Sequence, residues 1–277
     1  MVATPIGNLG DITARALESL ARADAIAAED TRVTARLLEH HHLRARLIAV
    51  HEHNERQSAD KIIGELSRGR NVALVTDAGT PGIADPGALV VAKTRAAGFR
   101  VVPIPGPNAA VTALSAAGMP DGPFLFFGFL PPKPAARRKA LESLRALPFA
   151  LVFYEAPHRI VESVEDLAAV LGAERPVVLA RELTKMFEEI HRCPLGDAAA
   201  WLKENPDRRR GEFVLVLGAA AVGKADADWE PLLAALLSEL PLARAVKLTC
   251  RITGAKKNAV YERALGLTGE KRVERRC

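Results

Sequence analysis

The chain has 277 residues, of which 49% are hydrophobic and 26% are charged, with a formal charge of +5. These values are ordinary for a soluble enzyme and allow two compact domains. No apolar run approaches the ~20 residues that a membrane span requires, and the N-terminus lacks a signal-peptide pattern. Three scattered cysteines are too few for a disulfide framework or a metal site, so we expect a cytoplasmic protein without bound metal.

The N-terminal stretch predicts a short strand followed by a loop and a helix. Only residues 1–3 precede Thr4-Pro5, whereas a typical strand has ~5–6 residues, so the first strand looks clipped. Residues 4–11 are rich in turn-forming residues. Asp11 is placed to cap a helix over residues 12–23, whose apolar side chains recur on one face.

Two strand–helix units follow, and both contain histidines. We expect strands at 25–28 and 47–50. The polar segment 29–32 (EDTR) follows the first strand, and 51–55 (HEHNE) follows the second. The three histidines at 40–42 point about 100° apart on a helix and cannot converge on one metal ion. His51 and His53 could share one side of a strand, but no cysteine or third histidine lies nearby. Polar residues lining a site at the strand's end are the better interpretation.

A loop rich in glycine and proline lies at the centre of the first half. Residues 71–76 predict a strand and a helical pattern begins at Ala88, while residues 77–87 between them contain three glycines and two prolines. This composition cannot continue either element, so we expect a loop at the carboxyl end of a strand, where open α/β sheets bind small ligands. Its only charged side chains are Asp77 and Asp85, which favours a ligand with hydroxyls or a positive centre over a bare phosphate.

A third turn-rich loop closes the first half. A strand is expected at 100–104, followed by Pro105-Gly106-Pro107-Asn108, and Asn108 can cap a helix of small residues over 109–117. The order of strand, loop and helix, repeated about five times, predicts a parallel sheet covered on both faces. Residues 118–123 are the best candidate for a domain boundary.

The second half predicts a mixed sheet, because several strands follow one another with little helix between them. The expected strands are 124–129, 149–153, 176–180, 188–194 and 212–217. Polar segments follow two of these strands, at 154–159 (YEAPHR) and 181–185 (RELTK). The basic cluster 137–139 opens a helix, where positive charge opposes the helix dipole. This placement indicates either an anionic partner or a surface loop.

The C-terminal segment is strongly basic. Residues 241–277 hold ten Lys and Arg against three Glu. Such a segment often binds nucleic acid, although a solvated helical face is an alternative. Three short helices are expected, over 231–240, 242–252 and 256–265, and Gly254 gives the last two a helix-turn-helix shape.

Eight motifs occur in order along the chain: VATPIGNLGD, AAEDTR, HEHNE, DAGTPGIADPG, PGPNAA, YEAPHR, ARELTK and RRGEFVLV. With them the chain resembles the tetrapyrrole-methylase superfamily, specifically the RsmI branch of small-subunit ribosomal RNA (cytidine-2′-O)-methyltransferases. The resemblance covers nearly the whole chain, including the basic tail. It implies an α/β fold with two α/β domains, 1–118 and 119–220, and a helical domain with its linker, 221–277.

The resemblance also implies a homodimeric enzyme that uses S-adenosylmethionine, bound between the two α/β domains, to methylate small-subunit (16S) ribosomal RNA. The cofactor contacts that it implies are Pro5, Ile6, Gly7, Asp77, Ala78, Gly79, Thr80, Pro81, Ala84, Asp85, Pro105 and Thr112. A zwitterionic sulfonium ligand fits a lining of backbone amides, small residues and a carboxylate.

The acceptor would be a ribose hydroxyl, which is a poor nucleophile, so a general base would help. The candidates are Lys185, Glu182, Glu155 and His158. A lysine can act only if burial or a nearby cation lowers its pKa. Lys185 is favoured narrowly over Glu182, but a reaction without any base and a purely structural salt bridge remain alternatives. The expected RNA contacts are Arg137, Arg138, Lys139, Arg244, Lys247, Arg251, Lys256 and Lys257.

Three other functions compete with this interpretation. A tetrapyrrole C-methyltransferase of the same fold needs neither the basic tail nor the HEHNE segment. A non-catalytic RNA-binding factor in ribosome assembly would use the tail and leave the cleft empty. An NAD-dependent dehydrogenase is set aside because no G-x-G-x-x-G follows the first strand.

Overall fold

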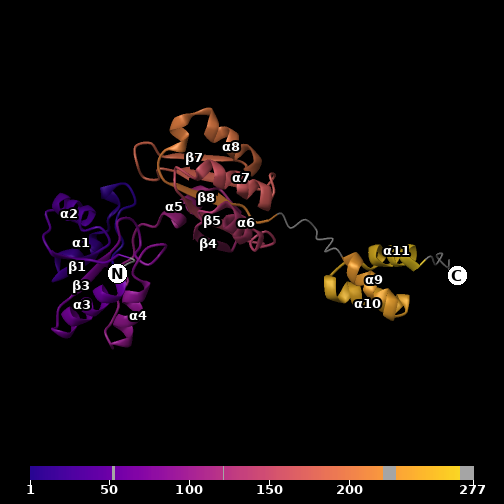
Figure 1. Ribbon diagram of the computed structural model, residues 1–277, viewed down its shortest axis with the longest axis horizontal. Helices are drawn as coiled ribbons and strands as arrows, with labels where there is room; N and C mark the ends of the chain where they lie inside the picture. The colour runs from indigo at the N-terminus through magenta and orange to yellow at the C-terminus, as the bar shows by residue number, and fades with distance from the viewer. Residues whose placement is uncertain (52–53, 121, 221–228, 269–277) are drawn as a thin grey trace. The chain divides into compact units, whose positions relative to one another are not determined.

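The computed structural model describes residues 1–51, 54–120, 122–220 and 229–268. By their contacts the residues form two compact units, 1–220 and 221–277 (Figure 1). Glu52 and His53 of the HEHNE segment and most of the expected linker lie outside the described residues.

The first sheet has three parallel strands in the order β2-β1-β3. These strands are β1 (Ala25–Ala28), β2 (Arg46–Ala49) and β3 (Val72–Val75). Helices cover both faces, as the sequence pattern predicts. Ile26 and Val75 belong to a core shared with α1 (Ala14–Ala21) and α2 (Thr31–His40). The alternate residues Ala27 and Leu74 belong to a second core, shared with α3 (Glu55–Ser67) and α4 (Ala88–Ala96).

Two sequence predictions about this region are wrong. Residues 100–104 do not form a strand: Ile104 makes one isolated parallel bridge to Val2, because only the first residues of the chain lie between this segment and β3. The first helix is capped by Thr13, whose hydroxyl accepts a hydrogen bond from the Ala16 N–H at 3.1 Å. Asp11 instead ends a short 3₁₀ turn, η1 (Leu9–Asp11).

The second sheet has five strands in the order β4-β5-β8-β6-β7. Only β4 and β5 are parallel, and the other neighbours are antiparallel, which confirms the predicted mixed sheet. The strands are β4 (Phe124–Phe129), β5 (Ala150–Glu155), β6 (Pro176–Arg181), β7 (Glu189–Pro194) and β8 (Phe213–Leu217).

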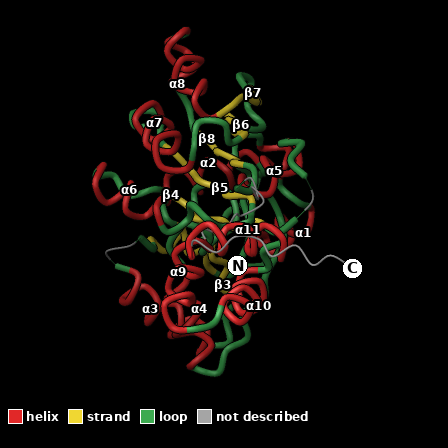
Figure 2. Tube along the Cα trace, turned by 90° about the vertical axis from the view of Figure 1, so that its right-hand side faces the viewer, coloured by secondary structure: helices red, strands yellow, loops and turns green. Residues whose placement is uncertain are grey.

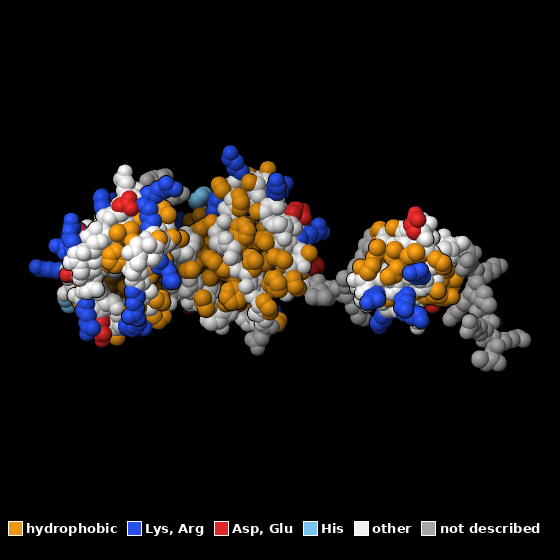
Figure 3. Space-filling view, turned by 90° about the horizontal axis from the view of Figure 1, so that it is seen from below, with side chains coloured by type: hydrophobic (Ala, Val, Ile, Leu, Met, Phe, Trp, Pro, Cys, Tyr) orange, Lys and Arg blue, Asp and Glu red, His pale blue; other side chains and the backbone are white. Residues whose placement is uncertain are grey.

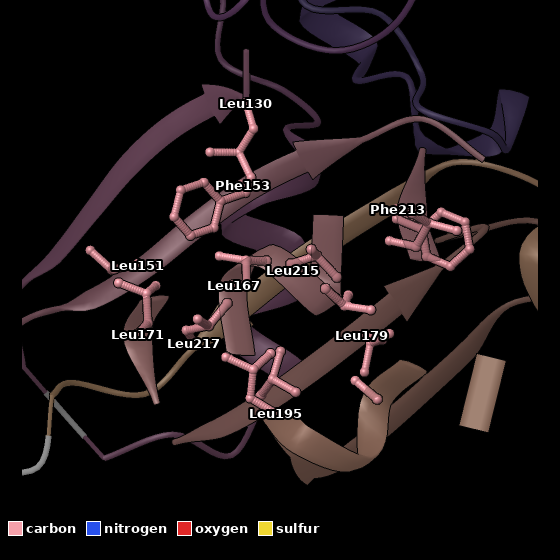
Figure 4. Close-up of a cluster of buried hydrophobic side chains, with 14 of the residues drawn as sticks. Leu130, Leu151, Phe153, Leu167, Leu171, Leu179, Leu195, Phe213, Leu215 and Leu217 are labelled. Carbon is pink, nitrogen blue, oxygen red and sulfur yellow. The ribbon is translucent and has the colours of Figure 1, made fainter. Parts of the chain in front are cut away.

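Helices also lie on both faces of this second sheet (Figure 2). One face packs on α6 (Pro134–Glu142), α7 (Ile160–Leu171) and α8 (Leu195–Glu204), which is followed by η2 (Pro206–Arg209). Figure 4 shows the leucine and phenylalanine side chains that fill this core.

The opposite face of the second sheet packs on α5 (Ala109–Ala116), whose buried residues Ala110 and Ala113 contact the sheet through small side chains. Asn108 caps this helix as expected, because its side chain accepts from the Val111 N–H. The predicted domain boundary at 118/119 would assign α5 to the first domain, although α5 packs on the second sheet. The division of residues 1–220 into two domains stays a prediction.

The C-terminal unit is a bundle of α9 (Trp229–Glu239), α10 (Leu242–Thr253) and α11 (Lys257–Thr268). Its core contains Trp229, Leu233, Val246 and Val260. Gly254 ends α10 in the left-handed conformation at φ 72°, which glycine adopts without steric cost. No described helix is long and apolar enough to cross a membrane.

Candidate methyl-donor site

A cleft of about 290 Å³ lies where loops of the first half meet the ends of β5, β6 and β8. Its residues come from both halves of the 1–220 unit. The lining comprises Ile6, Ala78, Gly79, Thr80, Ile83, Asp85, Asn108, Ala109, Phe129, Tyr154, Glu155, Ala156, Pro157, Ala180, Leu183, Lys185, Glu212, Phe213 and Val214.

Hydrogen bonds to backbone groups join the three turn-rich loops of the first half. Thr4 and Gly79 exchange two bonds, at 2.9 and 3.0 Å, and the Thr80 hydroxyl donates to the Pro107 carbonyl at 3.0 Å. Gly79 has a φ of 83°, and a Cβ there would lie 3.4 Å from Cγ2 of Ile6. The loop therefore needs glycine at this position, because a side chain would be strained in this conformation.

Asp85 is the acidic group of the first-half wall. Burial raises its pKa to about 6, and the negative charge of Glu29 adds to this effect. A hydrogen bond with the Thr76 side chain acts in the opposite direction, and the charge of Asp77 raises the pKa further. The same Thr76 hydroxyl donates to Glu29 Oε2 at 2.6 Å.

Aromatic side chains form the wall opposite these loops. The hydroxyl oxygen of Tyr154 accepts from the Ala110 N–H at 3.1 Å, and Phe126 and Phe129 contact the Tyr154 ring edge-to-face. Burial raises the pKa of Tyr154, and the negative charge of Asp85 contributes to the rise. Phe129 remains 52% exposed, so an aromatic face borders the mouth of the cleft.

Lys185 enters the cleft as one member of an ion-paired group. Its Nζ lies 2.8 Å from Glu182 Oε1 and 3.0 Å from Glu212 Oε2. Burial acts to lower the pKa of Lys185, but these two bonds outweigh it, and the pKa lies above its usual value. A lysine base needs the opposite shift, so the requirement behind its predicted role is not met.

The other three base candidates are also poorly suited. Burial acts to raise the pKa of Glu182, but hydrogen bonds from Lys185 and the Glu212 N–H outweigh it and lower the pKa. The buried Glu155 carboxylate is occupied by Arg159 and Ser163, each at 2.6 Å. His158 is exposed and does not line the cleft.

The predicted cofactor residues divide into three sets. Five of them line the cleft: Ile6, Ala78, Gly79, Thr80 and Asp85. Pro5 and Asp77 line a smaller neighbouring pocket of about 200 Å³, and a Cβ on Gly7 would lie 2.5 Å from Cγ of Lys185. The remaining members do not line the cleft: Pro81, Ala84, Pro105 and Thr112.

Sequence reasoning missed the aromatic wall and the wall formed by the strand ends, including Phe129, Tyr154 and Val214. Apolar residues at strand ends have the same pattern as core residues. Only the position of Tyr154 at the end of an expected strand pointed to the site.

The predicted RNA contacts differ in exposure. Arg137 is 1% exposed and its Nε lies 2.6 Å from Asp166 Oδ2, so it is not available for phosphate and its prediction is wrong. Arg138 also pairs with Asp166 but is 62% exposed, and Lys139 is exposed. The five predicted contacts in the C-terminal unit are exposed: Arg244, Lys247, Arg251, Lys256 and Lys257.

Comparison with known proteins identifies the two units. Residues 1–199 match the family model for tetrapyrrole (corrin/porphyrin) methylases, and residues 223–268 match that for the RsmI C-terminal HTH domain. The ribosomal RNA small subunit methyltransferase I of Escherichia coli O157:H7 is 54% identical, covering 97% of this chain and 95% of the relative. The protein of the same name from Vibrio cholerae serotype O1 is 49% identical, covering 98% and 95%.

Solved structures show the same fold at low identity. The methyltransferase CobJ has a TM-score of 0.59 at 23% identity, covering 78% of this chain and 91% of that one. Cobalt precorrin-4 methyltransferase, CbiF, has a TM-score of 0.60 at 16% identity, covering 78% and 92%. At these identities the likeness supports the fold alone.

The cleft fits S-adenosylmethionine in its chemistry. Asp85 offers negative charge to a sulfonium or ammonium group, and the small residues Ala78 and Gly79 leave their backbone accessible. The aromatic faces of Phe129 and Tyr154 suit a purine or a sulfonium methyl group. The fold, the cleft and the relatives agree: the chain belongs to the tetrapyrrole methylase family, as an S-adenosylmethionine-dependent methyltransferase with an RsmI-type C-terminal domain.

Proposed function

We propose that this protein methylates the 2′-hydroxyl of a cytidine in the 16S RNA of the small ribosomal subunit. The observation that carries the proposal is the match to ribosomal RNA small subunit methyltransferase I at 54% identity over 97% of the chain. The basic C-terminal segment, with ten Lys and Arg against three Glu over residues 241–277, is consistent with a polyanionic substrate. This substrate implies that the enzyme works in the cytoplasm, where bacterial ribosomes are assembled.

The donor site in this proposal is the cleft of the 1–220 unit. Ile6, Ala78, Gly79, Thr80 and Asp85 would hold the donor, with the other predicted cofactor residues in the surrounding loops. When bound, S-adenosylmethionine supplies a methyl group already activated by its sulfonium sulfur. The protein's main task is therefore to align the ribose oxygen with that methyl group and to exclude water.

The RNA contacts in this proposal are cations that face solvent. Figure 3 shows Lys and Arg side chains gathered on the visible face of the helical unit. Arg244, Lys247 and Arg251 lie on α10, Lys256 directly precedes α11, and Lys257 is its first residue. Arg138 and Lys139 on α6 would add contacts within the 1–220 unit, and such contacts give salt-dependent binding with little sequence preference.

The homodimer implied by the resemblance remains part of the proposal. Met186 is 89% exposed and Phe187 is 68% exposed, next to Lys185 of the cleft. In a dimer a partner subunit would cover these two adjacent apolar side chains. Sedimentation equilibrium of the wild type and of Phe187→Asp tests this point: we expect a dimer that the substitution weakens.

Mass spectrometry of ribosomal RNA tests the function. Nucleosides from a strain lacking this gene should miss one 2′-O-methylcytidine in 16S RNA, and the intact gene should restore it. An unchanged set of ribose methyl groups would contradict the proposal. Methylation of a tetrapyrrole instead would support the rival enzyme, and restoration by a variant unable to bind S-adenosylmethionine would support a non-catalytic assembly factor.

A further inference from the structure

The helix α4 follows the loop 77–87, called here the donor loop, and lacks a cap from its own N-cap residue. That residue is Gly87, which has no side chain to accept from the first N–H groups. Gly87 has a φ of 136°, and a Cβ there would lie 3.4 Å from Cδ2 of Leu74 and 3.6 Å from the backbone nitrogen of Gly82. The usual capping residues are therefore excluded, because any side chain would be strained in this conformation.

A carboxylate from another helix supplies the missing cap. Oε1 of Glu55, the first residue of α3 and the last of the HEHNE segment, accepts from the Gly87 N–H at 2.9 Å. The same oxygen accepts from the N–H groups of Leu89 at 3.0 Å and Val90 at 3.3 Å. Glu55 thus binds the N–H groups that a capping box would satisfy, and it places negative charge at the positive end of the helix dipole.

Hydrogen bonds to the first sheet anchor the start of α3. The Ser58 hydroxyl donates at 2.9 Å to the carbonyl of Ala49, the last residue of β2, and Ser58 is 1% exposed. The Asn54 side-chain amide donates to the same carbonyl at 3.3 Å. Glu55 lies between these two anchoring residues. A cap carried by an anchored helix can fix the loop end that it binds.

The second part of the donor loop has a backbone that needs such support. Gly82 has a φ of 81°, and Ala84 has a φ of 65°, a left-handed conformation that is unfavourable for alanine. Backbone of this kind persists only where the surrounding structure holds it. Glu55 provides a hold at Gly87, three residues after Ala84. Because Gly87 also lies close to Gly82, fixing Gly87 restricts both ends of this part of the loop.

We propose that Glu55 is a positioning residue for S-adenosylmethionine: by capping α4 it keeps Ile83 and Asp85 of the donor loop in place at the cleft. This inference rests on the donor site proposed above. Ile83 and Asp85 line the cleft, whereas Glu55 does not. The effect of Glu55 therefore reaches the donor only through the loop, and the inference gives the last residue of the HEHNE segment a specific role.

Calorimetric titration of S-adenosylhomocysteine into the full chain tests the proposal. Glu55→Ala removes the accepting oxygen and should weaken binding by about 10- to 100-fold, because fewer molecules hold the loop in its binding conformation. Glu55→Gln keeps an accepting oxygen at the same distance along the side chain and should stay within about fivefold of the wild type. Wild-type affinity in Glu55→Ala, or an equal loss in both variants, would overturn the proposal.

Steady-state methylation of small ribosomal subunits separates positioning from a general loss of structure. Glu55→Ala should raise KM for S-adenosylmethionine, while kcat at saturating donor stays within about threefold. A fall in kcat at unchanged KM would contradict the positioning role. Asp60→Ala is the matched control, because Asp60 pairs with Lys93 at 2.7 Å and joins α3 to α4 without contacting the donor loop. This exposed pair should leave both constants unchanged.

Hydrogen exchange of the ligand-free protein provides a readout that needs neither donor nor RNA. The amides of Leu89 and Val90 should exchange at least about tenfold faster in Glu55→Ala and close to the wild-type rate in Glu55→Gln, whereas amides of β5 should not change. Unchanged exchange at Leu89 and Val90 in Glu55→Ala would overturn the proposal.

The wild type distinguishes failure of this inference from failure of the proposed function. A wild type that binds S-adenosylhomocysteine but leaves 16S RNA unmethylated would contradict the RNA substrate, while the calorimetric comparison would still decide the role of Glu55. A wild type that binds no S-adenosylhomocysteine would contradict the donor site and this inference with it. Normal wild-type binding that is retained in Glu55→Ala would contradict the role of Glu55 alone.

Discussion

The two sides of the cleft hold their functional groups in different ways. The first-half side is built from backbone contacts, such as the pair between Thr4 and Gly79, and leaves Asp85 without a cation partner among the described residues. The second-half side is built from ion pairs, in which Lys185 and Glu155 are already engaged. Charge that is paired inside the protein fixes structure, whereas charge that is left unpaired in a cleft can serve chemistry.

Breaking a pair on the second-half side should have the largest effect. Glu155→Ala leaves Arg159, which is 17% exposed, without its carboxylate and should lower the free energy of unfolding by about 3–5 kcal/mol. Urea denaturation measures this change. Glu142→Ala, at an exposed and distant ion pair, is the control and should change stability by less than about 0.5 kcal/mol. A loss below 1 kcal/mol at Glu155 would show that the pair is not structural.

The helical unit also carries unpaired charge. Lys256 and Lys257 are exposed, and no ion pair is seen for either of them among the described residues. The charge reversal Lys256→Glu/Lys257→Glu should weaken RNA binding by roughly 10- to 100-fold and lower the salt dependence of log K by about 1.4. Affinity for S-adenosylmethionine should not change. Filter binding at several salt concentrations, with Lys61→Glu on α3 as control, measures the effect. Equal losses for RNA and donor would indicate a structural tail.

A matched pair of glycine substitutions tests the backbone side. Gly79→Ala forces a side chain into a φ of 83° close to Ile6 and should lower the free energy of unfolding by about 1–2 kcal/mol. Gly64→Ala lies in α3 with no atom within 4 Å of the added Cβ, so it should raise stability by up to about 1 kcal/mol. Thermal unfolding of both variants provides the comparison. If both substitutions raised the free energy of unfolding, or both lowered it, the conclusion that the loop requires glycine at position 79 would be contradicted.

The smallest effect is expected at Lys185. If this lysine is a structural cation, Lys185→Met should reduce the rate of methyl transfer by less than about tenfold and leave the pH profile in place. Because the pKa of Lys185 is raised, its stabilising interaction with Glu182 is present at neutral pH. This interaction is lost only as the pH rises through the pKa of the folded protein. A rate loss above 100-fold, together with a shift of the alkaline side of the pH–rate profile, would show that Lys185 is the general base after all.

The sequence predicted the features that depend on local chemistry. The Gly/Pro-rich loop containing Gly79 and Asp85 was found because few residues can form such a turn. The features that were missed depend on partners far away in the chain. Arg137 is neutralised by Asp166 on another helix, and Lys185 by Glu212 across the sheet. No local pattern reveals the distant partners Asp166 and Glu212, so the sequence could not show that Arg137 is buried or that the pKa of Lys185 is raised.

Transfer of labelled methyl groups by the purified protein tests the central claim most directly. Small ribosomal subunits from a strain lacking the gene would be incubated with methyl-labelled S-adenosylmethionine, and the RNA would be digested to nucleosides. We predict a single labelled product, 2′-O-methylcytidine, from 16S RNA. Label on a base, on several nucleotides or on no RNA at all would contradict the account.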